Sequence, residues 1–423
     1  MKFVFADGEK LGVYTDGKTE LFESSYITRF RENTIRGKKN KEWKKSTDRM
    51  MYDDYFDADR FGEDGVSAVI HAVALTTVDN NFLYAFSVNE TSGVYYKFTD
   101  DEAKTEAHAL SSNDVDFVSL TTCEDGSILG AAQTDEYTAR IAVFSRDGGD
   151  YKCLTGGDSF DENPYFDGRG NILFNSYAIG RDGMGAFVRY MPSEIYRLNP
   201  RTLQLDTPVS DPAYSFIKPM TDKAGDLFCI RKPGTDKEKK NPLIEILLIP
   251  VRIVQAIVGF ISTFVMCFSG KPLVDGNGKG RTTGDGSAAK NGPNRKVVIH
   301  NQILNVEKEM KKNSKSKTED YGFIPRSWKL VKLKGDNDDF SDGSFDKSSA
   351  EELASGVGDF CIVNDNGEEK LVYTNGRHIF ELRNENGAWK RKKLLDTEFC
   401  LRIGSIVRCA GKDNDNDDLF ERL

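Results

Sequence analysis

The sequence predicts an all-β fold made of many short strands joined by tight turns. The chain of 423 residues has 38 Gly, 16 Tyr and 27 Phe but only 12 Pro, and Asp-Gly and Asn-Gly pairs recur along it. Such a composition favours strands bounded by turns. The length suffices for one large β domain or for two to three ordinary ones.

A sequence unit repeats with a period in the high forties. Pro164-Tyr-Phe-Asp-x-x-Gly170 has the same frame as Pro219-Met-Thr-Asp-x-x-Gly225, and each is followed by an apolar strand. Gly126 fits the frame 44 residues before Gly170. Each unit continues into a further apolar-aromatic strand, and repeats of this kind are typical of β-propeller blades, because one small sheet buries its faces only against its neighbours. The units predict six blades.

The two ends of the chain are predicted to share one blade. Lys2-Phe-Val-Phe-Ala-Asp-Gly8 matches Lys370-Leu-Val-Tyr-Thr-Asn-Gly376, so the chain starts part-way through a blade. The segment Phe399–Val407 is expected to supply the missing innermost strand. This pairing of N- and C-terminal strands would close the ring and remove exposed sheet edges. The propeller is therefore assigned to residues 1–232 and 326–410.

The repeat pattern Asp-x-x-Gly-x-Ile-Leu-Phe followed by Ile-Tyr-x-Leu resembles the TolB-type propeller repeat, which is related to WD40 repeats. The resemblance covers most of the chain outside two insertions, and the Gly-His and Trp-Asp pairs of WD40 repeats are absent. It implies a propeller fold. It does not select a function, since such propellers serve as scaffolds, sensors and enzymes.

The first insertion, residues 26–65, is strongly charged. It holds nine Lys plus Arg between Arg29 and Arg49, around Trp43, and is followed by an acidic run from Asp53 to Asp64. Lipid headgroups or nucleic acid are possible ligands of a basic run, but the chain is acidic overall and no recognition module surrounds it. We expect no nucleic-acid partner, and pairing between the two opposite-sign halves explains the segment equally well.

The second insertion, residues 233–325, contains an apolar block from Leu243 to Phe268. From Arg231 to Lys334 there are 21 basic and 9 acidic residues, a net charge of +12. Because the whole chain has a net charge of −9, the remaining residues together carry −21. A basic segment around an apolar one suits an anionic membrane surface. As one helix the block would reach about 39 Å, enough to cross a hydrocarbon core of about 30 Å.

The block is predicted to lie within one leaflet of a membrane. Its flanking strands are expected in one blade, so the chain must return to the side that it left, and basic residues on both sides favour a cytoplasmic location for both ends. Two alternatives stay open: a helix packed on the propeller or a partner subunit, and a single-pass span. The predicted lipid-contacting residues are Leu247, Leu248, Val251, Val254, Ile257, Val258, Ile261, Phe264, Val265 and Phe268, and the predicted headgroup contacts are Lys237, Lys239, Lys240 and Lys271.

The rest of the second insertion is predicted to hold a glycine-rich flexible linker and a short helix. Residues 301–312 space Ile303, Val306 and Met310 at helical intervals, which favours an amphipathic helix that either folds back on a blade or contacts the membrane. Residues 411–423 form an acidic tail.

No catalytic residue, metal or cofactor is predicted. The four histidines lack metal-binding spacing, and the seven scattered cysteines are interpreted as reduced core thiols. The N-terminus lacks a secretory signal core, so export is not expected. His71, Asp116 and Ser215 open inner strands and are candidates for lining the central channel.

The sequence therefore predicts a non-enzymatic, cytoplasmic propeller that docks on membrane lipid and serves as a scaffold or interaction module for an unidentified protein partner. A propeller hydrolase or lyase with a site at the central channel is the first alternative, and a single-pass membrane signalling protein is the second.

Overall fold

The computed structural model describes residues 1–42, 66–77, 81–99, 105–234, 295–315, 320–335, 350–385, 388–407 and 420, with the side chains of residues 38–42 left out. All of them belong to one compact unit, Met1–Gly234 with Pro293–Leu423. The predicted lipid and headgroup contacts, the glycine-rich linker and the acidic tail apart from Phe420 lie outside the described residues.

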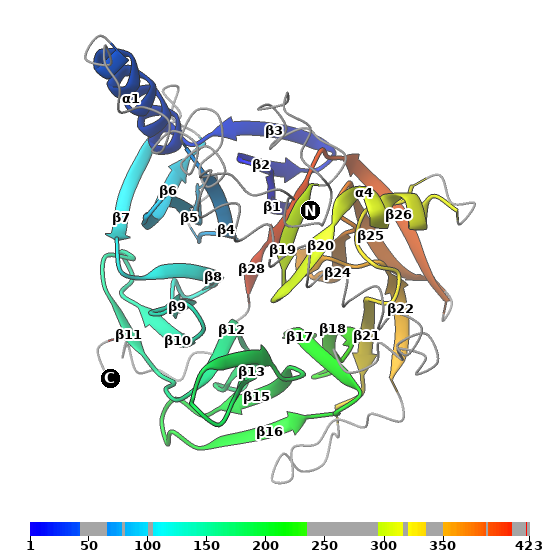
Figure 1. Ribbon diagram of the computed structural model, residues 1–423. Helices are drawn as coiled ribbons and strands as arrows, with labels where there is room; N and C mark the ends of the chain where they lie inside the picture. Colours follow the sequence, from blue (N-terminus) through cyan, green and yellow to red (C-terminus); the bar gives the residue numbers. More distant parts are fainter. Residues whose placement is uncertain are drawn as a thin grey trace, which may run out of the picture. The chain divides into compact units, whose positions relative to one another are not determined.

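Four-stranded antiparallel sheets dominate the described part of the chain (Figure 1). The first consists of β27 (Cys400–Gly404), β1 (Lys2–Asp7), β2 (Lys10–Thr15) and β3 (Lys18–Glu23). The second consists of β4 (Ala68–Leu75), β5 (Asn81–Val88), β6 (Thr91–Phe98) and β7 (Glu106–Ser112). The third consists of β17 (Tyr214–Thr221), β18 (Leu227–Pro233), β21 (Lys329–Leu333) and β22 (Glu351–Ser355). The fourth consists of β23 (Asp359–Asp365), β24 (Glu368–Thr374), β25 (His378–Glu385) and β26 (Ala388–Asp396).

Residues between the second and third of these sheets, together with a short C-terminal strand, form a larger, ten-stranded sheet. Its strands are β8 (Asp116–Cys123), β9 (Ile128–Gln133), β10 (Ala139–Phe144), β11 (Tyr151–Cys153), β12 (Ser159–Phe166), β13 (Ile172–Arg181), β14 (Phe187–Tyr190), β15 (Glu194–Leu198), β16 (Leu205–Val209) and β28 (Ile406–Val407). One parallel bridge, Ala139 with Phe160, joins the β8–β11 part to the β12–β16 part.

The sheets have a propeller-like arrangement (Figure 1). The strands β4, β8, β12, β17, β23 and β27 contact one another in this order, and β27 contacts β4. Apolar side chains fill the space between neighbouring sheets, and one cluster joins Phe5 of β1, Phe174 of β13, Ile230 of β18 and Phe360 of β23. Burying such a side chain contributes about 1.5–3 kcal/mol. The predicted all-β class is confirmed, but four separate four-stranded sheets are seen where six blades were predicted.

The repeated Asp-x-x-Gly frame forms the turn between the first two strands of a set. Gly170 and Gly225 have φ of 90° and 84°, which a residue without a side chain adopts at no cost. The Asp167 side chain accepts hydrogen bonds from the amides of Arg169 and Asn171, and Asp222 holds the equivalent turn in the same way. The Asp and Gly of the repeat are therefore explained by the conformation of this turn.

The two ends of the chain meet in one sheet. Strand β1 pairs antiparallel with β27, in the register Val4 with Gly404 and Phe5 with Ile403. Beyond β27 the chain continues into β28, which pairs in parallel with β8 of the ten-stranded sheet. The C-terminal segment thus joins the sheet of the N-terminus to another part of the fold.

The second insertion leaves and re-enters a single sheet. Its flanking strands β18 and β21 pair antiparallel, with Leu227 opposite Leu333. Within it, β19 (Lys296–Ile299) and β20 (Gln302–Asn305) form a two-stranded hairpin, followed by α4 (Val306–Asn313). The helix predicted over 301–312 is therefore wrong in its first half, because Ile303 belongs to a strand that pairs with β19.

The first insertion begins with a helix, α1 (Ser25–Glu42), that the sequence interpretation did not anticipate. Ser24 accepts a hydrogen bond from the amide of Ile27, and Glu106 of β7 accepts from the amides of Ser25 and Tyr26. These contacts satisfy amides that the first helical turn leaves unpaired. The start of α1 is therefore fixed to the second sheet.

Of the seven cysteines, five lie among the described residues, and these are free thiols: Cys123, Cys229, Cys361 and Cys400 are buried, and Cys153 is exposed. Burial raises the pKa of the Cys361 thiol to about 12.

Among the described helices, none combines the length and the apolar character needed to cross a membrane. The apolar block Leu243–Phe268 lies outside the described residues.

Candidate functional site

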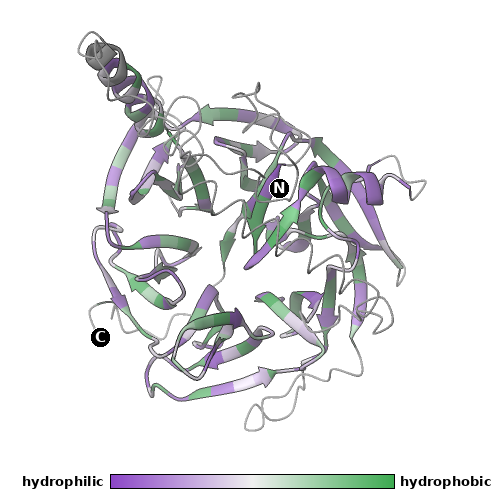
Figure 2. Ribbon diagram, in the orientation of Figure 1, coloured by the Kyte–Doolittle hydropathy of each residue, from purple (hydrophilic) through white to green (hydrophobic). Residues whose placement is uncertain are grey.

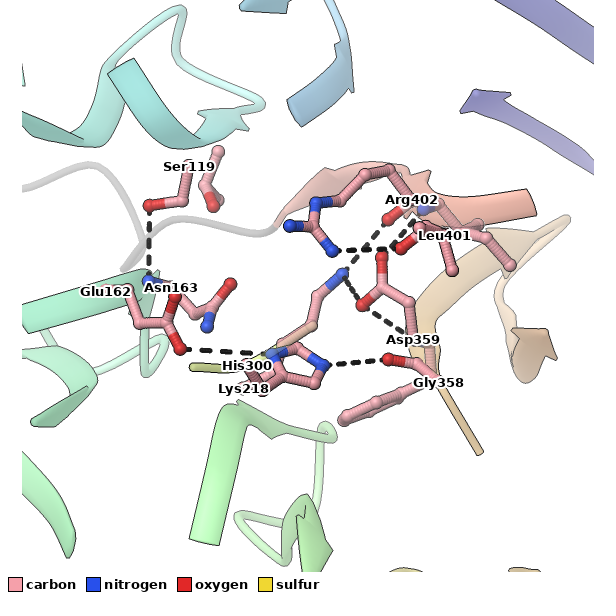
Figure 3. A network of polar contacts seen from close by, with 12 residues as sticks. Ser119, Glu162, Asn163, Lys218, His300, Gly358, Asp359, Leu401 and Arg402 are labelled. Carbon is pink, nitrogen blue, oxygen red and sulfur yellow. Dashed lines mark hydrogen bonds and ion pairs between the residues drawn. The ribbon is translucent and has the colours of Figure 1, made fainter. Parts of the chain in front are cut away.

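A pocket lies where the inner strands of the sheets approach one another (Figure 3). It is lined by residues of β4, β8, β12, β17, β23 and β27 together with the tip of the β19–β20 hairpin. Its polar lining residues are His71, Ser119, Thr121, Asn163, Lys218, His300, Asp359, Arg402 and Ser405. They come from parts of the chain that are far apart in sequence.

Backbone bulges aim several of these residues into the pocket. The register of β12 shifts between Glu162 and Tyr165, and that of β17 shifts between Ile217 and Met220. At these bulges Asn163 and Lys218 have φ of 56° and 53°, each directly before a proline. A bulge redirects a side chain and commonly occurs at functional sites. The repeated prolines of the sequence units therefore mark where β12 and β17 turn toward the pocket.

An ion pair between Lys218 and Asp359 joins β17 to β23. Lys218 Nζ lies 2.5 Å from Asp359 Oδ1 and also donates to the carbonyl of Ile403 at 3.0 Å. Asp359 further accepts from the amides of Ile403 at 2.7 Å and Phe360 at 3.0 Å. The Asp359 carboxylate is almost fully buried, and these donors compensate for its desolvation.

Arg402 of β27 reaches the pocket beside His71 of β4. Its Nε donates to the carbonyl of His71 at 2.5 Å, and its Nη1 donates to the carbonyl of Leu401 at 3.1 Å. Burial and the neighbouring Arg402 charge lower the pKa of His71 to about 4. His71 is therefore neutral at pH 7, and its Nε2 shares a hydrogen bond with Ser87.

The tip of the β19–β20 hairpin enters the pocket from the insertion. His300 and Asn301 have φ of 47° and 57°, the two positive values of a type I′ turn. His300 Nε2 lies 2.8 Å from the carbonyl of Gly358, and Nδ1 lies 3.9 Å from Glu162 Oε1 (Figure 3). The hairpin is thus held against β12 and β23.

Two buried charged residues, Glu162 and Lys232, lie next to His300. Burial opposes ionisation of Glu162, but the nearby imidazole of His300, the hydrogen bond from Asn175 and the charge of Arg402 outweigh it, so its pKa lies below the usual value. Lys232 donates to the carbonyl of His300 at 2.6 Å, and its Nζ lies 5.3 Å from the ring centroid of Trp328. Burial lowers the pKa of Lys232 to about 8.

Of the three residues that the sequence suggests for lining the central channel, one lines the pocket and two do not. His71 lines the pocket, whereas Asp116 and Ser215 are not among its lining residues. Asp116 opens β8, where burial raises its pKa, and Ser215 accepts a hydrogen bond from the amide of Ser193. Sequence reasoning missed Lys218, His300, Asp359 and Arg402.

Among the described residues, no group of three or more His, Cys, Asp and Glu side chains is placed to hold a metal ion. The pocket instead offers one ion pair, one guanidinium bonded to carbonyl groups, and hydroxyl and amide groups.

No family model matches the sequence, and no curated protein matches it. Several solved structures align with this chain. TolB from Acinetobacter baumannii aligns with a TM-score of 0.46 and 10% identity over 95% of this chain and 65% of that chain. A putative TolB from Agrobacterium tumefaciens aligns with a TM-score of 0.38 and 8% identity over 81% of this chain and 85% of that one. The tricorn protease aligns with a TM-score of 0.39 and 11% identity over 96% of this chain and 35% of that one.

The propeller-like arrangement of sheets confirms the propeller class that the repeats predict. The chain spans slightly less than two thirds of the Acinetobacter baumannii protein. These structural neighbours include both TolB proteins and a protease.

Proposed function

We propose that this protein is a six-bladed propeller that docks on the cytoplasmic surface of a membrane through its second insertion and serves as a non-enzymatic scaffold for a protein partner. The count of six treats the ten-stranded sheet as two blades joined by the Ala139–Phe160 bridge. The cyclic order of contacts from β4 to β27 supports that count.

The observation that carries the membrane proposal is an exposed apolar pair on the β19–β20 hairpin. Val298 and Ile303 lie directly opposite each other and are 63% and 68% exposed. On the other face of the hairpin Ile299 and Leu304 are buried. The outer face of a half-buried hairpin is normally polar, so this apolar pair favours contact with an apolar environment.

The charge around this pair suits anionic lipid. Residues 295–315 carry six basic side chains and two acidic ones, a net charge of +4 on a chain of net charge −9. Lys296, Lys308, Lys311 and Lys312 are exposed. Figure 2 shows the hydrophilic helix α4 beside the more hydrophobic hairpin. An apolar patch among lysines is the composition of an interfacial membrane contact.

Both flanks of the insertion belong to one sheet, which favours docking over a single crossing. Because β18 pairs with β21, the chain must return to the side of the membrane that it left. Limited proteolysis of vesicle-bound protein tests this point. Cleavage within residues 1–234 and within 295–423 from the same side supports docking, and protection of only one of them would establish the single-pass alternative.

Sedimentation with vesicles tests the membrane proposal. The full chain is expected to bind vesicles that contain phosphatidylserine more strongly than pure phosphatidylcholine vesicles. Deletion of residues 243–268 is expected to remove most binding, and Val298→Thr with Ile303→Thr to weaken it several-fold. The matched control is Val188→Thr with Leu205→Thr, which changes two apolar residues that are 57% and 51% exposed elsewhere.

The outcomes of this experiment are separable. If the full chain and the deletion variant stay equally in the supernatant, membrane docking is wrong. If the deletion removes binding but the hairpin variant binds like its control, the block anchors the protein and the hairpin does not contribute.

A further inference from the structure

Arg402 holds an unused set of donors in the central pocket. A guanidinium has five N–H groups, and Arg402 uses Nε and one Nη1 hydrogen on the carbonyls of His71 and Leu401. Both acceptors are neutral. Within the described chain, Arg402 makes no ion pair, although it lines the pocket. A charged group held in a partly enclosed pocket is normally paired with an opposite charge.

The nearby carboxylates are committed to other partners. Asp359 is bonded to Lys218 Nζ and to two backbone amides. Glu162 accepts from Asn175 Nδ2 at 3.2 Å and faces His300, and it is not among the residues that line the pocket. Figure 3 draws no hydrogen bond or ion pair between Arg402 and Glu162 or His300.

The charged lining of the pocket therefore carries an excess positive charge. Lys218 and Asp359 cancel, His71 is neutral at pH 7, and Arg402 remains. Ser119 accepts a hydrogen bond from the amide of Asn163 at 3.2 Å, so its hydroxyl proton is available to a ligand. The remaining wall is apolar and includes Val118, Pro164, Pro219, Met220 and Ile403.

We propose that this pocket binds a carboxylate, which Arg402 recognises through its free N–H groups and Ser119 through its hydroxyl. The planar guanidinium matches the two oxygens of a carboxylate. The apolar wall selects a ligand with a short aliphatic group next to the carboxylate. Both a free small carboxylate and the C-terminus of a peptide carry this chemistry. The site is independent of membrane docking.

Calorimetric titration of the full chain tests the proposal with four probes. They are butyrate, its neutral analogue butanamide, an acetylated trialanine with a free C-terminal carboxylate, and the same peptide with a C-terminal amide. Saturable binding of at least one carboxylate, with no binding of its amide, is expected. Preference for the peptide acid identifies a chain terminus as the ligand, and preference for butyrate identifies a free small carboxylate.

Substitutions locate the binding site. Arg402→Met is expected to weaken carboxylate binding by about tenfold to a hundredfold, the effect of losing hydrogen bonds to a charged group. Arg402→Lys keeps the charge but not the planar fork, and an intermediate loss is expected. The control Arg231→Met removes an arginine that pairs with Glu352 elsewhere in the fold and should bind like the wild type.

Each remaining outcome counts against the proposal. Absence of saturable binding of both carboxylates by the wild type overturns it, as does equal binding by the wild type and Arg402→Met. If circular dichroism shows that Arg402→Met is unfolded, Arg402→Lys and Ser119→Ala decide the question. Wild-type affinity in both of these variants would then refute it.

Discussion

Lys218 and Asp359, which are 141 residues apart in sequence, form an ion pair of 2.5 Å at the centre of the fold. The pair connects β17 to β23, and Asp359 also accepts the amide of Ile403 on β27. Strands of three sheets therefore contact the Asp359 carboxylate, and the loss of Lys218 should lower the free energy of unfolding.

Replacement of Lys218 by Met is expected to lower the free energy of unfolding by about 3–5 kcal/mol, because it leaves a buried carboxylate without its counter-charge. Chemical denaturation measures the change. Lys393→Met is the matched control, since Lys393 pairs with Asp320 at a site where the two side chains are 39% and 30% exposed. That pair should contribute less than about 1 kcal/mol. Equal losses in both variants would show that Asp359 does not depend on Lys218.

The lowered pKa of His71 predicts a pH-dependent stability. With a folded pKa of about 4 against an ordinary 6.5, only the unfolded chain binds this proton between these two values. The stability of the wild type relative to His71→Gln should therefore fall as the pH falls from 6.5 to 4, by up to about 1.4 kcal/mol per unit. Denaturation of both proteins across this range measures the difference. A difference that does not vary with pH would contradict the predicted titration.

Glu106 is predicted to hold the N-terminus of α1. It accepts two helix amides and pairs with Lys97 at 3.0 Å, with both side chains buried. Glu106→Gln should cost about 1–3 kcal/mol and increase hydrogen exchange in the first turns of α1. Glu9→Gln is the control, since Glu9 pairs with Arg31 of the same helix at an exposed site. If exchange in α1 rises equally in both, the cap is not what fixes the helix.

The turn at His300 should tolerate substitutions according to backbone conformation. His300→Asn keeps a residue type that adopts positive φ and removes the contact with the carbonyl of Gly358, for an expected cost of about 1–3 kcal/mol. His300→Val adds the strain of a β-branched residue at φ 47°, of the order of a further 1–2 kcal/mol. Hydrogen exchange in β19 and β20 reports both losses. Similar protection in the two variants would argue against the type I′ turn.

The local sequence indicated the bulges and His71 of the central pocket, but it did not indicate the contacts between distant segments. The prolines at 164 and 219 recur in the repeat frame, and they follow the bulge residues Asn163 and Lys218. His71 was a candidate because it opens an inner strand. The pairing of Lys218 with Asp359 and the entry of His300 into the pocket have no local signal, because each joins segments that are distant in the chain.

The sequence by itself determined the all-β class, the repeated turns at Gly170 and Gly225, and the pairing of the N-terminal strand with the segment Phe399–Val407, of which only Cys400–Gly404 pairs with β1. The all-β class and the turns depend on backbone conformation and strand patterning, which neighbouring residues encode, and the pairing of the two ends was indicated by the likeness of Lys2–Gly8 to Lys370–Gly376. The tertiary structure alone decided that residues 302–305 form a strand, that Ser25–Glu42 form a helix capped by Glu106, and that Arg402 faces a pocket. Those outcomes depend on partners that the sheets bring together from distant parts of the chain, and such contacts override local helix and strand preferences.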